Sequence, residues 1–122
     1  MLIRKVNFAT VQRFAKQAAK EHVSITDTNN TIWFIGEIND EIVAIAGLIQ
    51  VAYGMRIKGV YVLPEYRAKG YGNELTQYLF ELCHNRCSNI EVFAYNPNFY
   101  EHHGFKRFGS LPNGAIKLRR AD

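Results

Sequence analysis

One junction in the sequence constrains the fold more than any other feature, because a strand pattern runs through a glycine-bearing loop directly into a helix pattern. The apolar run at residues 55–63 ends at Pro64, and a helical stripe then extends over residues 72–86. The stripe consists of Leu75, Tyr78, Leu79, Leu82 and Cys83. Another strand pattern follows at residues 90–95. The order strand, helix, strand predicts a βαβ unit with the glycine loop at its first turn.

The remaining segments predict a single domain spanning residues 1–122. Strand patterns occupy residues 2–6, 31–38 and 41–51, with weaker ones at 106–108 and 115–118. Helix patterns occupy residues 7–20 and 98–103, and residues 21–30 form a polar loop. Asn39-Asp40 predicts a two-residue hairpin turn. The run at 42–49 is apolar without alternation, which is typical of a strand that is covered on both faces.

Composition narrows the class of protein. The 122 residues are 48% hydrophobic and 21% charged, values that exclude a disordered chain and favour one globular domain. The longest apolar run is far shorter than the roughly 18 residues that a membrane span requires. Arg4 and Lys5 interrupt the first apolar residues too early for a signal-peptide core. We therefore expect a soluble, cytoplasmic protein.

Charge and cysteine content add two expectations. The net charge of +4 and a pI near 9.2 permit an anionic partner, a nucleotide cofactor as readily as a nucleic acid. Cys83 and Cys87, with His84 between them, have the spacing of half a metal site, but the sequence offers no second ligand pair. We therefore predict reduced thiols and no metal.

The loop at residues 64–72 predicts an anion site. Gly70 and Gly72 allow successive amides to point into one concavity, and the first turn of the following helix presents further unpaired amides at its positive end. Arg67 and Lys69 add positive charge. A dinucleotide-binding loop would require glycine where Leu75 stands, and a Walker loop would require its lysine after the glycine. The loop therefore suits a phosphate or pyrophosphate but fits neither nucleotide motif.

Two segments resemble the GNAT family of N-acetyltransferases. Residues 67–72, Arg-Ala-Lys-Gly-Tyr-Gly, resemble the acyl-CoA signature Arg/Gln-x-x-Gly-x-Gly/Ala, and Pro-Glu-Tyr precedes them as in the family. Residues 99–105, Phe-Tyr-Glu-His-His-Gly-Phe, resemble the second signature, Phe-Tyr-Glu-x-x-Gly-Phe. The order of elements agrees over nearly the whole chain. The resemblance implies an α/β (α+β) fold: a mixed, mostly antiparallel sheet of about six to seven strands, helices on both faces, and a central βαβ unit that binds acyl-CoA.

The resemblance also implies acetyl-CoA as the donor and assigns its contacts. The pyrophosphate lies on the loop amides, and the pantetheine arm pairs with the preceding strand, where Gly59 favours a bend or bulge. The cofactor-binding residues implied in this way are Val60, Tyr61, Val62, Arg67, Ala68, Lys69, Gly70, Tyr71, Gly72, Asn73 and Asn96. A backbone N–H near Val62 corresponds to the oxyanion donor. Tyr100 corresponds to the general acid that protonates the departing thiolate.

The chain departs from the family in ways that leave the catalytic base open. Arg56 stands where the histone-acetylating branch has a glutamate base. Glu37, Glu91, His102 or a chain of waters are the alternatives, although we expect Glu91 to face outward from its strand. His102 and His103 are expected to be exposed at a helix end. Asn96 lies only four residues before Tyr100, so an alternative for Asn96 is a helix cap.

The acceptor is likewise open. Only one convincing helix follows the first strand, so residues 21–30 are expected to supply the second wall of the acceptor pocket. A protein or peptide amine is then as plausible as a small one. Two alternatives remain: a CoA-binding protein without catalysis, and a nucleic-acid-associated module, for which the evidence is the pI, Tyr53 and the basic tail at residues 117–120. A monomer or a homodimer fits equally well.

Overall fold

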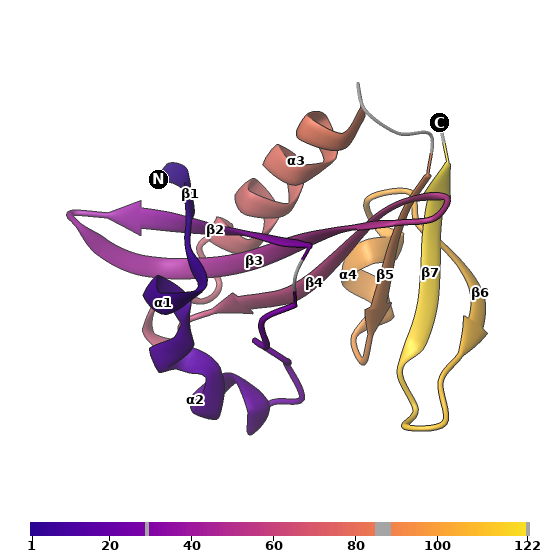
Figure 1. The fold of residues 1–122 in the computed structure, drawn as a ribbon, viewed down its shortest axis with the longest axis horizontal. Coiled ribbons are helices and arrows are strands. Elements are labelled where there is room, and N and C mark those ends of the chain that lie inside the picture. Colours follow the sequence, from indigo (N-terminus) through magenta and orange to yellow (C-terminus); the bar gives the residue numbers. More distant parts are fainter. Residues whose placement is uncertain (29, 85–88, 122) are drawn as a thin grey trace.

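The computed structural model describes residues 1–28, 30–84 and 89–121, which form a seven-stranded sheet with helices on both faces (Figure 1). The strands are β1 (Leu2–Val6), β2 (Thr31–Ile38), β3 (Glu41–Val51), β4 (Gly54–Val62), β5 (Asn89–Ala94), β6 (Lys106–Ser110) and β7 (Ile116–Ala121). Their order across the sheet is β1-β2-β3-β4-β5-β7-β6. Among the strands of the described residues, only β4 and β5 pair in parallel. The predicted mixed, mostly antiparallel sheet is confirmed.

The helices differ from the sequence prediction mainly near the N-terminus. They are α1 (Phe8–Val11), the 3-10 helix η1 (Gln12–Phe14), α2 (Ala15–Ala19), the 3-10 helix η2 (Pro64–Tyr66), α3 (Tyr71–His84) and α4 (Pro97–Glu101). The predicted continuous helix over 7–20 is therefore wrong in detail, because a 3-10 turn divides it. The predicted end of the long helix, and Cys87 with it, lies outside the described residues, whereas Cys83 is buried in the core.

The sheet is covered on both faces because its central strands direct apolar side chains to each side. Trp33 and Ile35 of β2 pack with Ile45 of β3 against Val11 and other residues of the α1–α2 region. The alternate residues of the same strands belong to a second cluster with α3, which contributes Leu75, Leu79 and Phe80. This arrangement explains the unbroken apolar run in β3, where Ile42 to Leu48 are all buried. The hairpin turn before it is also confirmed, since Asn39 and Asp40 both have positive φ.

Strands β4 and β5 run side by side for only a short distance and then separate (Figure 1). Their pairing covers three residues and stops at Ile57↔Val92, although β4 continues to Val62 and β5 to Ala94. Gly59, at φ 61°, lies within a register irregularity between β3 and β4, as expected of a bulge. The end of β4 therefore pairs with β3 on one side and leaves its other edge open towards β5.

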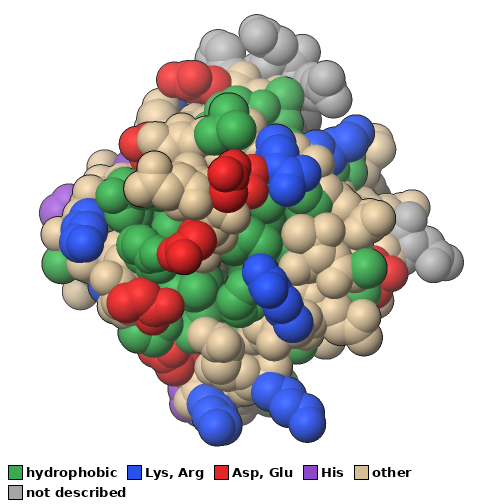
Figure 2. Space-filling view, turned by 90° about the vertical axis from the view of Figure 1, so that its left-hand side faces the viewer, with side chains coloured by type: hydrophobic (Ala, Val, Ile, Leu, Met, Phe, Trp, Pro, Cys, Tyr) green, Lys and Arg blue, Asp and Glu red, His purple; other side chains and the backbone are tan. Residues whose placement is uncertain are grey.

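The surface is mixed in character. Figure 2 shows apolar side chains gathered at the centre of one face, with acidic and basic side chains interspersed around them. Among the residues that the structure describes, no helix has both the length and the apolar character needed to cross a bilayer.

The bulge in β4 predicts a large effect of Gly59→Ala on stability. An added Cβ would lie 3.0 Å from both the Ser24 carbonyl oxygen and the Trp33 ring, on a backbone conformation that L residues rarely adopt. We expect the free energy of unfolding, measured by urea denaturation, to fall by about 1–3 kcal/mol. Gly109→Ala is the matched control, because only the flexible Lys117 side chain is near its Cβ. Equal stability of the two variants would contradict a strained bulge.

Candidate active site

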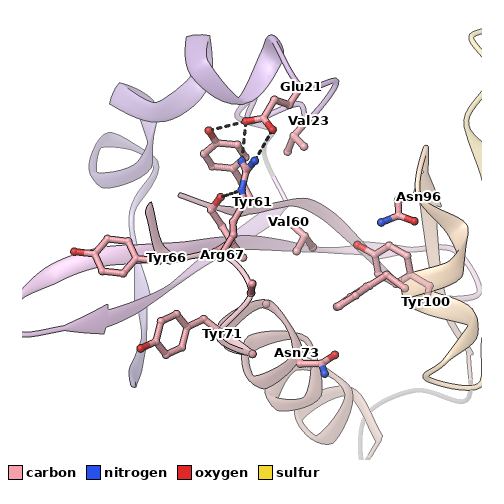
Figure 3. A pocket seen from close by; sticks show the side chains of 15 residues that line it. Glu21, Val23, Val60, Tyr61, Tyr66, Arg67, Tyr71, Asn73, Asn96 and Tyr100 are labelled. Atoms are coloured by element: carbon pink, nitrogen blue, oxygen red, sulfur yellow. Dashed lines mark hydrogen bonds and ion pairs between the residues drawn. The ribbon is translucent and has the colours of Figure 1, made fainter. Parts of the chain in front are cut away.

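A cavity of about 660 Å³ lies where β4 separates from β5. It is bounded by the end of β4, the loop before α3, the first turn of α3, and α4 (Figure 3). Of the residues predicted as site residues, those lining it are Val60, Tyr61, Val62, Arg67, Ala68, Gly70, Tyr71, Gly72, Asn73, Asn96 and Tyr100. The fold thus brings together nearly all of the predicted residues, from segments up to 40 positions apart.

Lys69 is the predicted residue that does not line this cavity. Its ammonium lies 5.9 Å from the centroid of the Tyr66 ring. The neighbouring loop residues have the backbone that the anion-site prediction requires, since Ala68 and Gly70 have φ values of 63° and 86°. Intrahelical bonding in α3 begins with the Glu74 amide, which donates to the Gly70 carbonyl at 3.0 Å. The amides of residues 68–73 are therefore available to an anion in the cavity.

Arg67 makes its contacts within the protein (Figure 3). Its two terminal nitrogens donate to the two oxygens of Glu21 at 2.8 and 2.7 Å, and Nε donates to the Val62 carbonyl at 2.9 Å. The Tyr61 hydroxyl also donates to Glu21, at 3.1 Å. The hydrogen bonds from Arg67 lower the pKa of Glu21. Arg67 therefore fastens the segment after α2 to the end of β4.

Tyr100 is a buried phenol at the α4 side of the cavity. It lies on α4, is 7% exposed, and packs edge-on against Phe99 and Phe105. In Figure 3 its hydroxyl points into the cavity on the side of Val60. Burial raises the pKa of Tyr100 well above its usual value, so the phenol stays protonated at neutral pH.

The two asparagines and the histidines take different positions. Asn96 is at the N-cap position of α4, but its side chain makes no cap hydrogen bond and instead lines the cavity. Asn73 bonds through Oδ1 to His103 Nε2 at 2.7 Å. His103 is therefore half-buried rather than exposed, and burial lowers its pKa, whereas His102 is exposed as predicted.

Glu91 does not face outward as the sequence analysis expects. It is 1% exposed and accepts hydrogen bonds of 2.6 Å from the Tyr53 hydroxyl and from Arg56 Nε. The strand alternation places it opposite the apolar face as expected, but the side chains of Tyr53 and Arg56 cover it there. A buried carboxylate is tolerated because these donors replace its hydration.

A second cavity of about 360 Å³ adjoins the first. The two have Glu21, Val23, Val60, Asn96 and Tyr100 in common. Residues 21–24 line the second cavity, in agreement with the expectation that the polar segment after the first helix supplies a wall. Sequence reasoning did not identify Glu21 itself, because no motif distinguishes it from other polar residues of that segment.

The described residues contain no group of three histidine, cysteine, aspartate or glutamate side chains that could hold a metal ion. The carboxylates of the site are occupied by arginine and tyrosine donors instead. The first cavity is lined instead by the loop before α3, by four tyrosines and by the Glu21 carboxylate that pairs with Arg67.

Burial of Tyr100 predicts that the free energy of unfolding decreases at alkaline pH. The folded protein holds the phenolic proton above pH 10, where the unfolded chain releases it, so stability must fall as the pH rises past about 10. We expect urea denaturation to show that the wild type loses about 1 kcal/mol more than Tyr100→Phe between pH 9 and pH 11. The other tyrosines contribute equally to the pH dependence of both proteins, so their contributions cancel in this comparison. Parallel losses in the two proteins would contradict a buried, protonated Tyr100.

The model of the GNAT acetyltransferase domain family matches residues 29–107, well over half of the chain. No curated protein sequence matches the chain.

Several solved structures share the fold. Rv2747 from Mycobacterium tuberculosis, in complex with CoA and NLQ, is 12% identical with a TM-score of 0.80, over 100% of this chain and 99% of that one. An aminoglycoside 6'-N-acetyltransferase complexed with coenzyme A is 18% identical with a TM-score of 0.80, over 99% and 97%. The PaiA N-acetyltransferase from Thermoplasma acidophilum, in complex with coenzyme A, is 12% identical with a TM-score of 0.80, over 99% and 98%. With the family match over most of its length, the chain belongs to the GNAT acetyltransferase domain family.

Proposed function

We propose that this protein is an N-acetyltransferase that moves an acetyl group from acetyl-CoA to a primary amine by direct attack. The observation that carries the proposal is a single cavity that joins the loop amides before α3, the open edge of β4 and the Tyr100 phenol. The family match supports the reaction. Three proteins of the same fold were crystallised with CoA, which supports the same donor here.

The donor is held mainly by backbone groups in this proposal. Its pyrophosphate accepts hydrogen bonds from the amides of residues 68–73, and its pantetheine arm pairs with residues 60–62 where β5 has moved away. The Arg67 guanidinium already binds Glu21 and the Val62 carbonyl. Its contribution to the pyrophosphate is therefore the weaker one of a nearby positive charge.

The transfer itself needs an oxyanion donor and a proton. The neutral amine attacks the thioester carbonyl, and a backbone N–H near Val62 stabilises the oxyanion. As the carbon–sulfur bond breaks, Tyr100 gives its proton to the sulfur, and the proton that the new amide releases restores the phenol. Burial raises the pKa of Tyr100 and so keeps the phenol protonated and available as a donor. The same enclosure disfavours a free thiolate beside it, and this second effect favours transfer of the proton to the sulfur.

Glu21 is the carboxylate best placed to meet the acceptor amine. Among the described carboxylates it alone lines the two cavities, and it does so at the wall that they share. Glu37, which bonds to Arg4, and Glu91, which is enclosed by Tyr53 and Arg56, line neither cavity. A lowered pKa keeps Glu21 ionised, which attracts an ammonium group but makes it a weak base. Water therefore takes the ammonium proton before attack.

The alternatives differ in what they predict. A CoA-binding protein without catalysis would bind acetyl-CoA and release no thiol. A nucleic-acid module would need a continuous basic surface, whereas the face in Figure 2 intersperses acidic and basic groups. The two experiments below separate binding from catalysis.

Gly70→Val tests the loop. Its φ of 86° is unfavourable for a β-branched residue, although an added Cβ would meet no atom within 4 Å, so the fold should survive. We expect saturating acetyl-CoA, at a hundred times its Kd, to stabilise the wild type by about 2.7 kcal/mol and the variant by far less. Gly114→Val, at φ 92° outside the first cavity, controls for backbone strain. An unchanged thermal shift in folded Gly70→Val would remove the loop from donor binding.

Tyr100→Phe tests the general acid. The substitution retains the ring and its packing, so the affinity for acetyl-CoA should persist while thiol release across a panel of primary amines slows by about 10²-fold. The loss should appear in kcat rather than KM, because the proton is needed only as the thiolate departs. Tyr78→Phe, on α3 and outside the two cavities, is the matched control. A wild-type rate in Tyr100→Phe would show that another group protonates the sulfur.

A further inference from the structure

The second cavity adjoins the reacting centre and has a different chemical character from the first. It lies between β4, β5, residues 22–24 and the turn that joins β6 to β7. Tyr100 and Glu21 belong to both cavities, whereas Arg56 and Lys58 line the second one alone. If the first cavity holds the donor, as proposed above, a molecule in the second cavity can present an amine to the thioester.

The contacts of Arg56 leave its two terminal nitrogens exposed, and these form a fork that can bind a carboxylate. Its Nε donates to buried Glu91 at 2.6 Å, and its guanidinium carbon lies 4.4 Å from the centroid of the Phe93 ring. These two contacts fix both the position and the plane of the guanidinium. Within the described residues nothing is hydrogen-bonded to its two terminal nitrogens, and the side chain is 30% exposed. Two parallel N–H groups of this kind match the two oxygens of a carboxylate.

The charges around Arg56 favour an anion at that end of the cavity. Glu91 offsets one positive charge, but Lys58 projects from the same face of β4 two residues later. The Lys117 ammonium lies 5.9 Å from the centroid of the same Phe93 ring. Lys58 donates to the Thr26 carbonyl at 3.1 Å, which satisfies one of its three protons. Asp27 interacts electrostatically with Lys58 and adds a second negative charge to that of Glu91. The three positive charges of Arg56, Lys58 and Lys117 still leave the wall near Arg56 net positive, while the wall shared with the first cavity carries the Glu21 carboxylate.

An acceptor that matches both walls carries an amine at one end and a carboxylate at the other. We propose that the second cavity binds an amino carboxylate, with its carboxylate on the Arg56 fork and its amine between Glu21 and Tyr100. Glu91 and Phe93 act as positioning residues for Arg56. This proposal rests on the proposed acetyl transfer and names the class of acceptor for it.

The test uses thiol release from acetyl-CoA with acceptors of graded length. Straight-chain ω-amino carboxylates from glycine to 6-aminohexanoate are compared with the corresponding ω-amino amides. The amides have the same length and amine but no carboxylate charge. We expect at least one amino carboxylate to exceed its amide by about tenfold or more in kcat/KM, the scale of a charge-assisted hydrogen-bonded pair. The preferred chain length then reports the span from the fork to the thioester.

Substitution of Arg56 locates the preference. Arg56→Gln should reduce the carboxylate-to-amide ratio to near one, mainly through a higher KM for the amino carboxylates. Lys117→Gln removes a nearby charge that does not line the cavity and leaves the fork in place, so it should lower the ratio far less than Arg56→Gln does. If Arg56→Gln fails to fold because Glu91 loses its partner, Arg56→Lys retains a positive charge without the fork. This variant should retain less than half of the preference.

Failure of this proposal and failure of the proposed function give different results. Equal use of amides and amino carboxylates by the wild type, or a preference that survives in the Arg56 variants, overturns the amino carboxylate assignment and leaves acetyl transfer intact. Turnover of peptide amines with none of the amino carboxylates overturns it as well. Absence of thiol release with every amine, despite a thermal shift with acetyl-CoA, overturns the proposed transfer and the acceptor class together.

Discussion

The separation of β4 from β5 after three paired residues is the constraint on which the site depends. Each strand keeps an antiparallel partner on its other side, β3 for β4 and β7 for β5, so the sheet stays continuous while an opening forms within it. Backbone groups along the open edge of β4 then need partners, and a ligand that pairs like a strand can supply them. The bulge at Gly59 and the α4 helix carrying Tyr100 both lie beside this opening.

The contact between Arg67 and Glu21 connects the opening to the rest of the fold. One guanidinium joins the segment after α2 to the last residue of β4, which is also the start of the loop that forms the anion site. Both side chains are 42% exposed, so the pair contributes more to position than to stability. It also fixes Glu21 on the wall between the two cavities. The Arg67 side chain therefore connects the loop before α3 to the wall that the two cavities share.

Much of the fold follows from local sequence patterns, since the long strands, the Asn39-Asp40 turn and the α3 stripe all appear where hydrophobic periodicity predicts them. The division of the first helix at η1 was not predictable, because Val11, Phe14 and Ala18 satisfy a continuous helical period equally well. The site residues predicted from the motifs line one cavity, with the exception of Lys69. Glu21 was missed because its importance comes from Arg67, 46 positions later. A contact between residues so far apart in the sequence produces no periodic pattern from which it could be predicted.

Glu91 shows why strand alternation predicts direction better than burial. Its neighbours Ile90 and Val92 pack into the α3 cluster, so alternation correctly directs Glu91 to the opposite face. The short α1–α2 region covers that face only over the central strands, through Trp33, Ile35 and Ile45. Beyond β4 this region does not cover the face. There the side chains of Tyr53 and Arg56 cover Glu91 in place of a helix. The abbreviated N-terminal region thus leaves space for the second cavity, and a buried carboxylate orients the arginine that lines it.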